Sequence, residues 1–135
     1  MSVFVDTSAF YALMVRTDAA HGPVRRAFVA LIDSGRPMWT TSFVLVETMA
    51  LLQHRISLAA ARDFDDELLP AVQVRWVDEE LYRLGADRLW REDRRQLSLV
   101  DCVSLEFMKR EGLTTALAVD PDLQQAGIDV VPSGR

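Results

Sequence analysis

Two aspartates follow directly on short apolar segments that have the composition of β-strands. Asp6 comes after residues 3–5, and Asp120 comes after residues 115–119. An acid at such a point can satisfy the free backbone N–H groups of the next helix, and Pro121 suits a first helical position. A carboxylate at the end of a strand can equally bind a cation, so helix capping and metal binding are both open for these two residues.

Glu47 is the only charged residue in the segment SFVLVETMALLQ, residues 42–53. Its neighbours one helical turn away are apolar, and we expect its carboxylate to be shielded from water. An ionised carboxylate removed from water is costly unless a cation or strong hydrogen-bond donors meet it. Basic residues are absent within one turn of Glu47, so either a distant arginine or a bound metal ion is expected to meet it.

Asp101 lies three residues after Ser98 in the segment LSLVDCVSL. A serine followed three residues later by an acid can form a capping box at the start of a helix. The helix that follows is mostly apolar, however, and a carboxylate in its first turn is expected to point toward the rim of a sheet. Asp101 is therefore a candidate both for a helix cap and for a site at that rim.

Taken together, these acids predict a site for a divalent cation. Two carboxylates about 4 Å apart repel each other by roughly 4 kcal/mol at an effective dielectric constant of about 20. A bound divalent ion removes this repulsion, and oxygen ligands without cysteine or well-spaced histidine favour Mg²⁺ or Mn²⁺ over zinc. The expected metal ligands and catalytic residues are Asp6, Glu47, Asp101 and Asp120.

Short apolar segments alternate with helical patterns along the whole chain. The predicted strands are residues 3–5, 38–40, 72–77, 115–119 and 128–131. The predicted helices are residues 42–54, 57–69 and 99–111, with two further helical stripes formed by Val24, Ala27, Phe28, Leu31 and Ile32 and by Tyr82, Ala86, Leu89 and Trp90. This alternation predicts an α/β fold with a largely parallel sheet covered on both faces. In such folds, ligands bind at the carboxyl ends of the strands.

The composition fits one domain spanning residues 1–135. Half of the residues are hydrophobic and about a quarter are charged, which is enough for a core and excludes a disordered chain. We expect a cytoplasmic protein, because no apolar run reaches the roughly 18 residues of a membrane span and no secretory leader is visible. The single cysteine, Cys102, is expected to be a small core residue.

The net charge of −5 argues against nucleic-acid binding over a broad positive surface. The densest basic cluster is RLWREDRRQ, residues 88–96, in which Arg88, Arg91 and Arg95 share a helix face. Acidic residues interrupt the cluster, so a solvated face with internal ion pairs is favoured over an RNA-binding ridge. The tryptophans are expected to be core or interface residues rather than stacking platforms for bases, and they are Trp39, Trp76 and Trp90.

Four segments of the chain resemble motifs of the PIN domain, in order and in spacing. They are VDTSAF, TSFVLVE, LVDCVSL and AVDPDL, and they extend over nearly the whole chain. The small single-domain size is similar to that of the VapC-type toxins of toxin–antitoxin pairs. The resemblance implies a three-layer α/β/α sandwich with a central sheet of four to five strands.

The resemblance also implies an activity and a set of partners. PIN domains bind Mg²⁺ or Mn²⁺ through their acids and cut RNA, and the matching positions are Asp6, Glu47, Asp101 and Asp120, with Ser8 as a supporting polar residue. The implied protein is an endoribonuclease that forms a homodimer and is inhibited by a cognate antitoxin protein. The alternative is a binding module that keeps the fold and has no turnover.

One motif departs from the family pattern. Ala118 and Leu123 stand where the family often has Thr and Phe around the last acid, and Asp122 is a competing carboxylate. We prefer Asp120 as the fourth ligand because it lies at the end of the strand, whereas Asp122 falls within the following helical turn.

Overall fold

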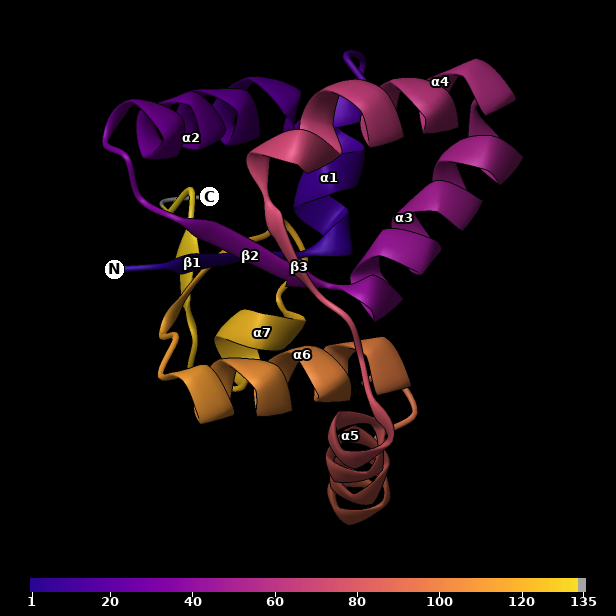
Figure 1. Ribbon diagram of the computed structural model, residues 1–135, viewed down its shortest axis with the longest axis vertical. Coiled ribbons are helices and arrows are strands. Elements are labelled where there is room, and N and C mark those ends of the chain that lie inside the picture. Colours follow the sequence, from indigo (N-terminus) through magenta and orange to yellow (C-terminus); the bar gives the residue numbers. More distant parts are fainter. Residues whose placement is uncertain (134–135) are drawn as a thin grey trace.

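A five-stranded parallel β-sheet forms the centre of the protein (Figure 1). The computed structural model describes residues 1–133, and its strands lie in the order β3-β2-β1-β4-β5. The strands are β1 (Val3–Val5), β2 (Met38–Thr41), β3 (Gln73–Arg75), β4 (Thr115–Leu117) and β5 (Asp129–Val131). All neighbouring strands run parallel, which confirms the predicted fold class, although β3 is shorter than residues 72–77.

Helices cover both faces of this sheet. In Figure 1, α1, α2 and α4 lie above the sheet, α6 and α7 lie below it, and α5 packs on the outer side of α6. The helices are α1 (Thr7–Met14), α2 (His21–Asp33), α3 (Ser42–Arg55), α4 (Leu58–Asp63), α5 (Glu79–Glu92), α6 (Leu99–Glu111) and α7 (Asp122–Gln125). A π turn (Phe64–Leu68) and a 3₁₀ turn (Leu69–Ala71) continue α4. No helix within residues 1–133 is long and apolar enough to span a membrane.

The central strand β1 is buried on both of its faces. Val3, Phe4 and Val5 are fully buried, as expected for the middle of a parallel sheet that helices cover on both sides. Phe4 packs against Phe107 of α6, with the ring centroids 6.0 Å apart. This packing fixes the end of β1 and therefore the position of the next residue, Asp6.

Helices α3 and α6 begin at the predicted positions, and both carry hydroxyl caps. The Thr41 side chain accepts a backbone hydrogen bond at the start of α3, and Ser98 caps α6 in the predicted capping box. Helix α6 is buried over residues 102–108, including Cys102, the predicted core cysteine. Residues 42–53 contain a single charge, which is typical of a mostly buried helix, but α3 packs on one side only and Val46 is 61% exposed.

The buried face of helix α5 overlaps only partly with the predicted stripe. Ala86 of that stripe is buried as predicted and Leu89 is half-buried, but Tyr82 and Trp90 are exposed, and Leu81 and Gly85 are buried instead. The reason is the close packing of α5 on α6, since a β-carbon at Gly85 would lie 2.4 Å from Cγ2 of Val103. A glycine at this contact lets the two helix backbones approach each other. A prediction based on large apolar residues overlooks such a contact.

The tryptophans divide between the core and the surface. Trp39 is half-buried, and its ring centroid lies 6.1 Å from that of Phe107. Trp76 and Trp90 are 67% and 68% exposed, so the core assignment is wrong for both and the interface assignment stays a prediction. Ile32, which ends the predicted stripe of α2, is also exposed, because the buried side of that helix is narrower than the stripe.

Candidate active site

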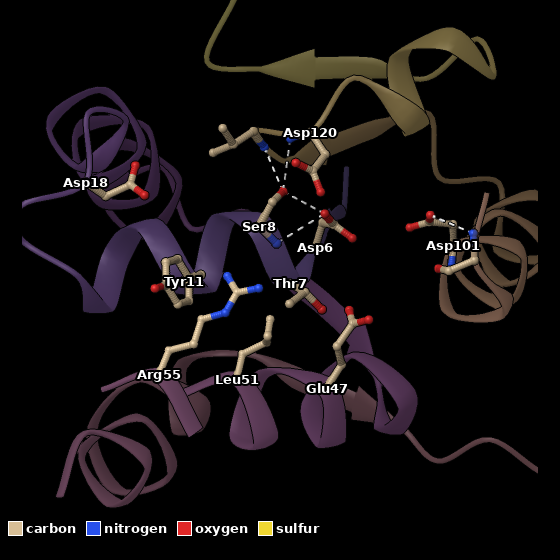
Figure 2. Close-up of a pocket in the computed structure, with 12 residues that line it drawn as sticks. Asp6, Thr7, Ser8, Tyr11, Asp18, Glu47, Leu51, Arg55, Asp101 and Asp120 are labelled. Atoms are coloured by element: carbon tan, nitrogen blue, oxygen red, sulfur yellow. Dashed lines mark hydrogen bonds between the residues drawn. The ribbon is translucent and has the colours of Figure 1, made fainter. Parts of the chain in front are cut away.

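The strand order reverses at β1, which has β2 on one side and β4 on the other. Ligands of parallel α/β sheets bind at the carboxyl ends of the strands near such a point. A cavity of about 500 Å³ opens there, and its wall includes all four predicted acids, Asp6, Glu47, Asp101 and Asp120 (Figure 2). The structure therefore brings together residues from the end of β1, from α3, from α6 and from the turn after β4.

Asp6 is 4% exposed and caps helix α1. Its Oδ2 atom accepts hydrogen bonds from the Ser8 N–H at 3.2 Å and from the Ser8 hydroxyl at 2.7 Å. Both bonds go to the same oxygen, so within residues 1–133 Oδ1 makes no hydrogen bond and is available to the cavity. Burial raises the pKa of Asp6 to about 6, against the lowering effect of the Ser8 bonds, and the carboxylates of Asp101 and Asp120 add to the rise.

Ser8 connects the two strand ends that carry acids. Besides donating to Asp6, its hydroxyl oxygen accepts hydrogen bonds from the N–H of Val119 at 2.9 Å and from the N–H of Asp120 at 3.2 Å (Figure 2). The turn after β4 is thereby tied to the first turn of α1. A side chain predicted only as a supporting polar group lies at the centre of the site.

Asp101 combines a helix cap with a position on the cavity wall. Its Oδ2 accepts a hydrogen bond from the Ser98 N–H at 3.2 Å, and its own N–H donates to the Ser98 hydroxyl at 3.0 Å. Burial raises the pKa of Asp101, the bonds with Ser98 lower it, and the carboxylates of Asp122 and Glu47 raise it further. As in Asp6, the cap uses only one of the two carboxylate oxygens.

Glu47 and Asp120 complete the wall without capping a helix. Glu47 is half-buried, which is less shielding than predicted, and it has no ion pair within residues 1–133. Asp120 is exposed, and the cap position of α7 is Pro121. Partial burial raises the pKa of Asp120, and the carboxylate of Asp122 adds to the shift. Asp122 does not line the cavity, so Asp120 stays the preferred fourth acid.

The side chains around the cavity fit a hard divalent cation. The groups on its wall that can bind a metal are oxygen donors, with neither histidine nor cysteine among the described lining residues. Oxygen donors of this kind favour Mg²⁺ or Mn²⁺. The Oγ1 atom of Thr7, next to Asp6, is buried without a hydrogen-bond partner in the described part of the chain. The cavity thus has an unused polar atom beside its most buried acid.

The acids surround the cavity and do not converge on one point. Figure 2 shows Asp101 set apart from Asp6 and Glu47. Over residues 1–133, no three acidic, histidine or cysteine side chains are grouped closely enough to hold a metal ion. Side-chain rotations are needed to bring the carboxylates around a single ion.

The sequence matches the PIN domain over residues 3–129. The chain belongs to the PIN domain family. The 23S rRNA-specific endonuclease VapC20 of Mycobacterium tuberculosis is 35% identical over 137 aligned residues, which cover 96% of this chain and 98% of that protein. The crystal structure of M. tuberculosis VapC20, described as a sarcin–ricin loop cleaving toxin, has a TM-score of 0.82 over 93% of this chain and 95% of its own. FitAcB from Neisseria gonorrhoeae, with a TM-score of 0.69 at 14% identity over 96% of each chain, shares the fold.

The residues of this PIN domain that line the cavity and were not predicted from the sequence include Tyr11, Asp18 and Arg55. Among the described lining residues Arg55 alone is basic, and its guanidinium carbon lies 5.8 Å from the centre of the Tyr11 ring. Arg55 stands two helical turns after Glu47 on the same face of α3, so the spacing of the two charges was a usable signal. Asp18 carries no such signal, because only the tertiary fold brings it to the cavity.

Proposed function

We propose that this PIN domain is a metal-dependent endoribonuclease that hydrolyses RNA phosphodiester bonds as the toxin of a toxin–antitoxin pair. The observation that carries the proposal is the single cavity that carboxylates from four separate elements line. Such clustering of like charge is unfavourable for the fold alone, because the carboxylates repel each other. The 35% identical relative is a 23S rRNA-specific endonuclease, which makes RNA with a sarcin–ricin loop the first substrate to test.

The residues proposed to hold Mg²⁺ or Mn²⁺ are Asp6, Glu47, Asp101 and Asp120. A divalent ion in this site supplies polarisation of the phosphodiester and activation of a water nucleophile. The Ser8 hydroxyl donates to Oδ2 of Asp6, and the Ser98 N–H donates to Oδ2 of Asp101, so Oδ1 is the oxygen that each acid has left for the ion. Binding of the ion would require the acids to rotate toward one another.

Arg55 provides the cavity with a positive group for the RNA backbone. Its position over the Tyr11 ring limits the freedom of the guanidinium group and keeps it on the cavity wall. We expect Arg55 to contact a phosphate oxygen near the scissile bond, since guanidinium groups bind phosphate through paired hydrogen bonds.

The second candidate function is a binding module of the same fold without turnover. It is favoured by the finding that Asp6 and Asp101 both cap helices, which gives each a structural reason to be present. Under this alternative the acids serve the fold, and an amide in place of either carboxylate leaves the function unchanged. The nuclease proposal and the binding module therefore predict opposite results for the same substitution.

We also propose two protein partners. A cognate antitoxin is expected to bind over the cavity, in line with the description of the VapC20 structure as that of a toxin. A second copy of the chain is expected from the resemblance to PIN-domain toxins, which usually dimerise.

The substitution Asp6→Asn tests the proposal. Asparagine caps a helix about as well as aspartate, so the variant should fold, and its thermal midpoint without metal should equal or exceed that of the wild type. We expect cleavage of sarcin–ricin loop RNA in Mg²⁺ to fall by about 100-fold or more, since even indirect ligand partners cost 10–100-fold. Gel assays with EDTA as a blank measure this. Unchanged cleavage by the purified variant contradicts the catalytic assignment of Asp6, whereas the absence of Mg²⁺-dependent cleavage by the wild type favours the binding module.

A matched pair of variants tests the choice of the fourth acid. Asp120→Asn removes a carboxylate from the cavity wall, whereas Asp122→Asn removes one that lies outside it. We expect the first variant to lose activity and the second to keep it within a few-fold. The reverse order assigns the fourth ligand to Asp122 and leaves the nuclease proposal intact.

A further inference from the structure

A second cavity lies beside the first, where α5 turns into α6. Its volume is about 420 Å³, and its wall includes Trp90, Arg94, Arg95 and Leu97. Ser98 lines both cavities, so the second one borders the candidate active site at the residue that caps the helix of Asp101. An extended ligand that leaves the first cavity on this side reaches the second directly.

Trp90 gives this second cavity an exposed aromatic surface. The side chain lies in the last turn of α5 and is 68% exposed, and the structure overturns its assignment to the core. Exposed tryptophan is unfavourable in water, since its large ring packs well against other groups. Bases in single-stranded RNA offer flat faces on which such a ring can stack, largely independent of their sequence.

The predicted helix face of Arg88, Arg91 and Arg95 is wrong for Arg95, because α5 ends at Glu92. The arginines at this corner of the protein, from the last turns of α5 to the start of α6, also differ in their contacts. Arg88 forms ion pairs within the protein, with its Nε 3.6 Å from the carboxylate of Glu92 and its Nη1 2.9 Å from that of Glu106. This pairing also occupies Glu92, one of the acids that interrupt the cluster. Arg94 and Arg95 are exposed and have no ion pair within residues 1–133. Asp93 also lines the second cavity, so the charged side chains on its wall, Asp93, Arg94 and Arg95, carry a net charge of +1 in a protein whose net charge is −5.

The turn that carries these arginines is well defined. Asp93 has a left-handed conformation, φ 50°, and its N–H donates to the carbonyl of Leu89 at 3.1 Å, which ends α5. The N–H of Leu97 donates to the carbonyl of Arg94 at 3.1 Å, and the Leu97 side chain is only 2% exposed. Because the turn is anchored at both ends, its exposed side chains have little backbone entropy to lose on binding.

We propose that Trp90, Arg94 and Arg95 form an RNA-binding surface for the single-stranded segment next to the scissile phosphate. Trp90 stacks on an unpaired base, and the two arginines contact backbone phosphates. This inference rests on the proposed function, in that it takes RNA to be the substrate of the adjacent cavity. RNA fits this surface better than a protein partner does. The exposed ring can stack on a base, the unpaired arginines can bind phosphates, and both lie beside the acid-lined cavity, as one RNA strand requires.

Binding is measured by fluorescence anisotropy with a labelled sarcin–ricin loop RNA in EDTA, so that no cleavage occurs. Trp90→Ala is expected to weaken binding by roughly five-fold or more, with an unchanged salt dependence. The double variant Arg94→Ala with Arg95→Ala is expected to weaken binding and to lower the slope of log K against log salt by about 1.4, at roughly 0.7 per phosphate contact. Trp90→Phe should retain most of the affinity.

The controls are matched in type and exposure. Trp76→Ala removes a tryptophan that is 67% exposed and lines neither cavity. Arg25→Ala with Arg26→Ala removes two adjacent exposed arginines of α2 that also have no ion pair in the described residues. Both controls should bind RNA as the wild type does, and thermal midpoints show whether every variant is folded.

The outcomes separate this inference from the proposed function. A wild type that cleaves RNA while the Trp90 and arginine variants bind like the controls overturns the inference alone. Variants that lose RNA binding in a protein without nuclease activity support the inference and overturn the proposed function. Absence of RNA binding by the wild type overturns the inference. The inference is also overturned if the Trp90 and arginine variants lose affinity for the antitoxin while their affinity for RNA stays unchanged.

Discussion

Asp6 caps helix α1 and faces the cavity at the same time. The two roles use different atoms, because Oδ2 accepts both hydrogen bonds from Ser8 and leaves Oδ1 for a ligand. Asp101 shows the same division, with Oδ2 accepting the bond from Ser98. Capping therefore leaves one oxygen of each carboxylate for a ligand, so a helix cap and a metal ligand are compatible roles at these two positions.

The burial of Asp6 predicts a stability that depends on pH. In the folded protein the pKa of Asp6 is raised from 3.8 to about 6, mainly by burial, so between these values the folded state binds more protons than the unfolded chain. The free energy of unfolding should therefore fall as pH rises from about 4 to about 6, by up to about 3 kcal/mol at full ionisation. Asp6→Asn should remove most of this fall, so urea unfolding in EDTA should show equal stability at pH 4 and a more stable variant at pH 7.

An exposed acid provides the control for this experiment. Asp33 ends α2 and is exposed, so Asp33→Asn should keep the pH profile of the wild type. A wild type and an Asp6→Asn variant with parallel profiles from pH 4 to pH 7 would show that Asp6 titrates normally in the folded protein.

At the scale of elements, the contact between α5 and α6 depends on a residue without a side chain. The buried face of α5 is centred on Gly85, and a β-carbon there would meet Cγ2 of Val103 at 2.4 Å and the Val103 backbone at 3.1 Å. The same contact carries the ion pair between Arg88 and Glu106. Since the last turn of α5 carries Trp90 and the turn after it carries Arg94 and Arg95, this packing also sets the position of the second cavity.

Gly85→Ala is expected to destabilise the protein although alanine favours helices. The added methyl group has to displace backbone as well as a side chain, and overpacking of this kind costs about 1–3 kcal/mol, which exceeds a helix-propensity gain of about 1 kcal/mol. Gly22→Ala in α2 is the matched control, because its β-carbon would meet only the flexible end of Arg26 at 3.3 Å. Thermal or urea unfolding of both variants measures the difference, and equal midpoints would show that the helices separate at little cost.

The elements themselves were largely predictable from the sequence, and the exceptions have physical causes. Strand β1 and helix α6 follow continuous apolar patterns and were placed correctly, because burial on both faces leaves a strong signal. The buried face of α5 was predicted only in part, because Ala86 is buried but the contact with α6 also uses Gly85 and leaves Tyr82 and Trp90 exposed. The spacing of apolar residues identifies a helix, and the face with the largest apolar side chains is then predicted to be buried. A close contact between two helices can instead bury the face with the smallest side chains.

At the scale of the whole molecule, the parallel topology assembles the cavity. The strand-end acids Asp6 and Asp120 were predictable because strand ends in a parallel sheet share one edge. Glu47 and Asp101 were predictable as carboxylates in apolar helices. The sequence could not supply the distances between the carboxylates or the place of Asp18 on the cavity wall, because these depend on the tertiary packing of the helices at the sheet edge.

The assembly of the whole protein is the last prediction. Large apolar side chains are exposed on α3, just after it and at the start of α4, with Val46 61%, Ile56 49% and Leu58 65% exposed. We expect the chain to dimerise through this region and to show twice 15.2 kDa by light scattering. Val46→Glu with Leu58→Glu should yield a folded monomer, since buried unpaired carboxylates are costly at an interface. Leu84→Glu, on exposed α5, should leave the dimer intact, and a wild type that stays at 15.2 kDa at high concentration contradicts dimerisation.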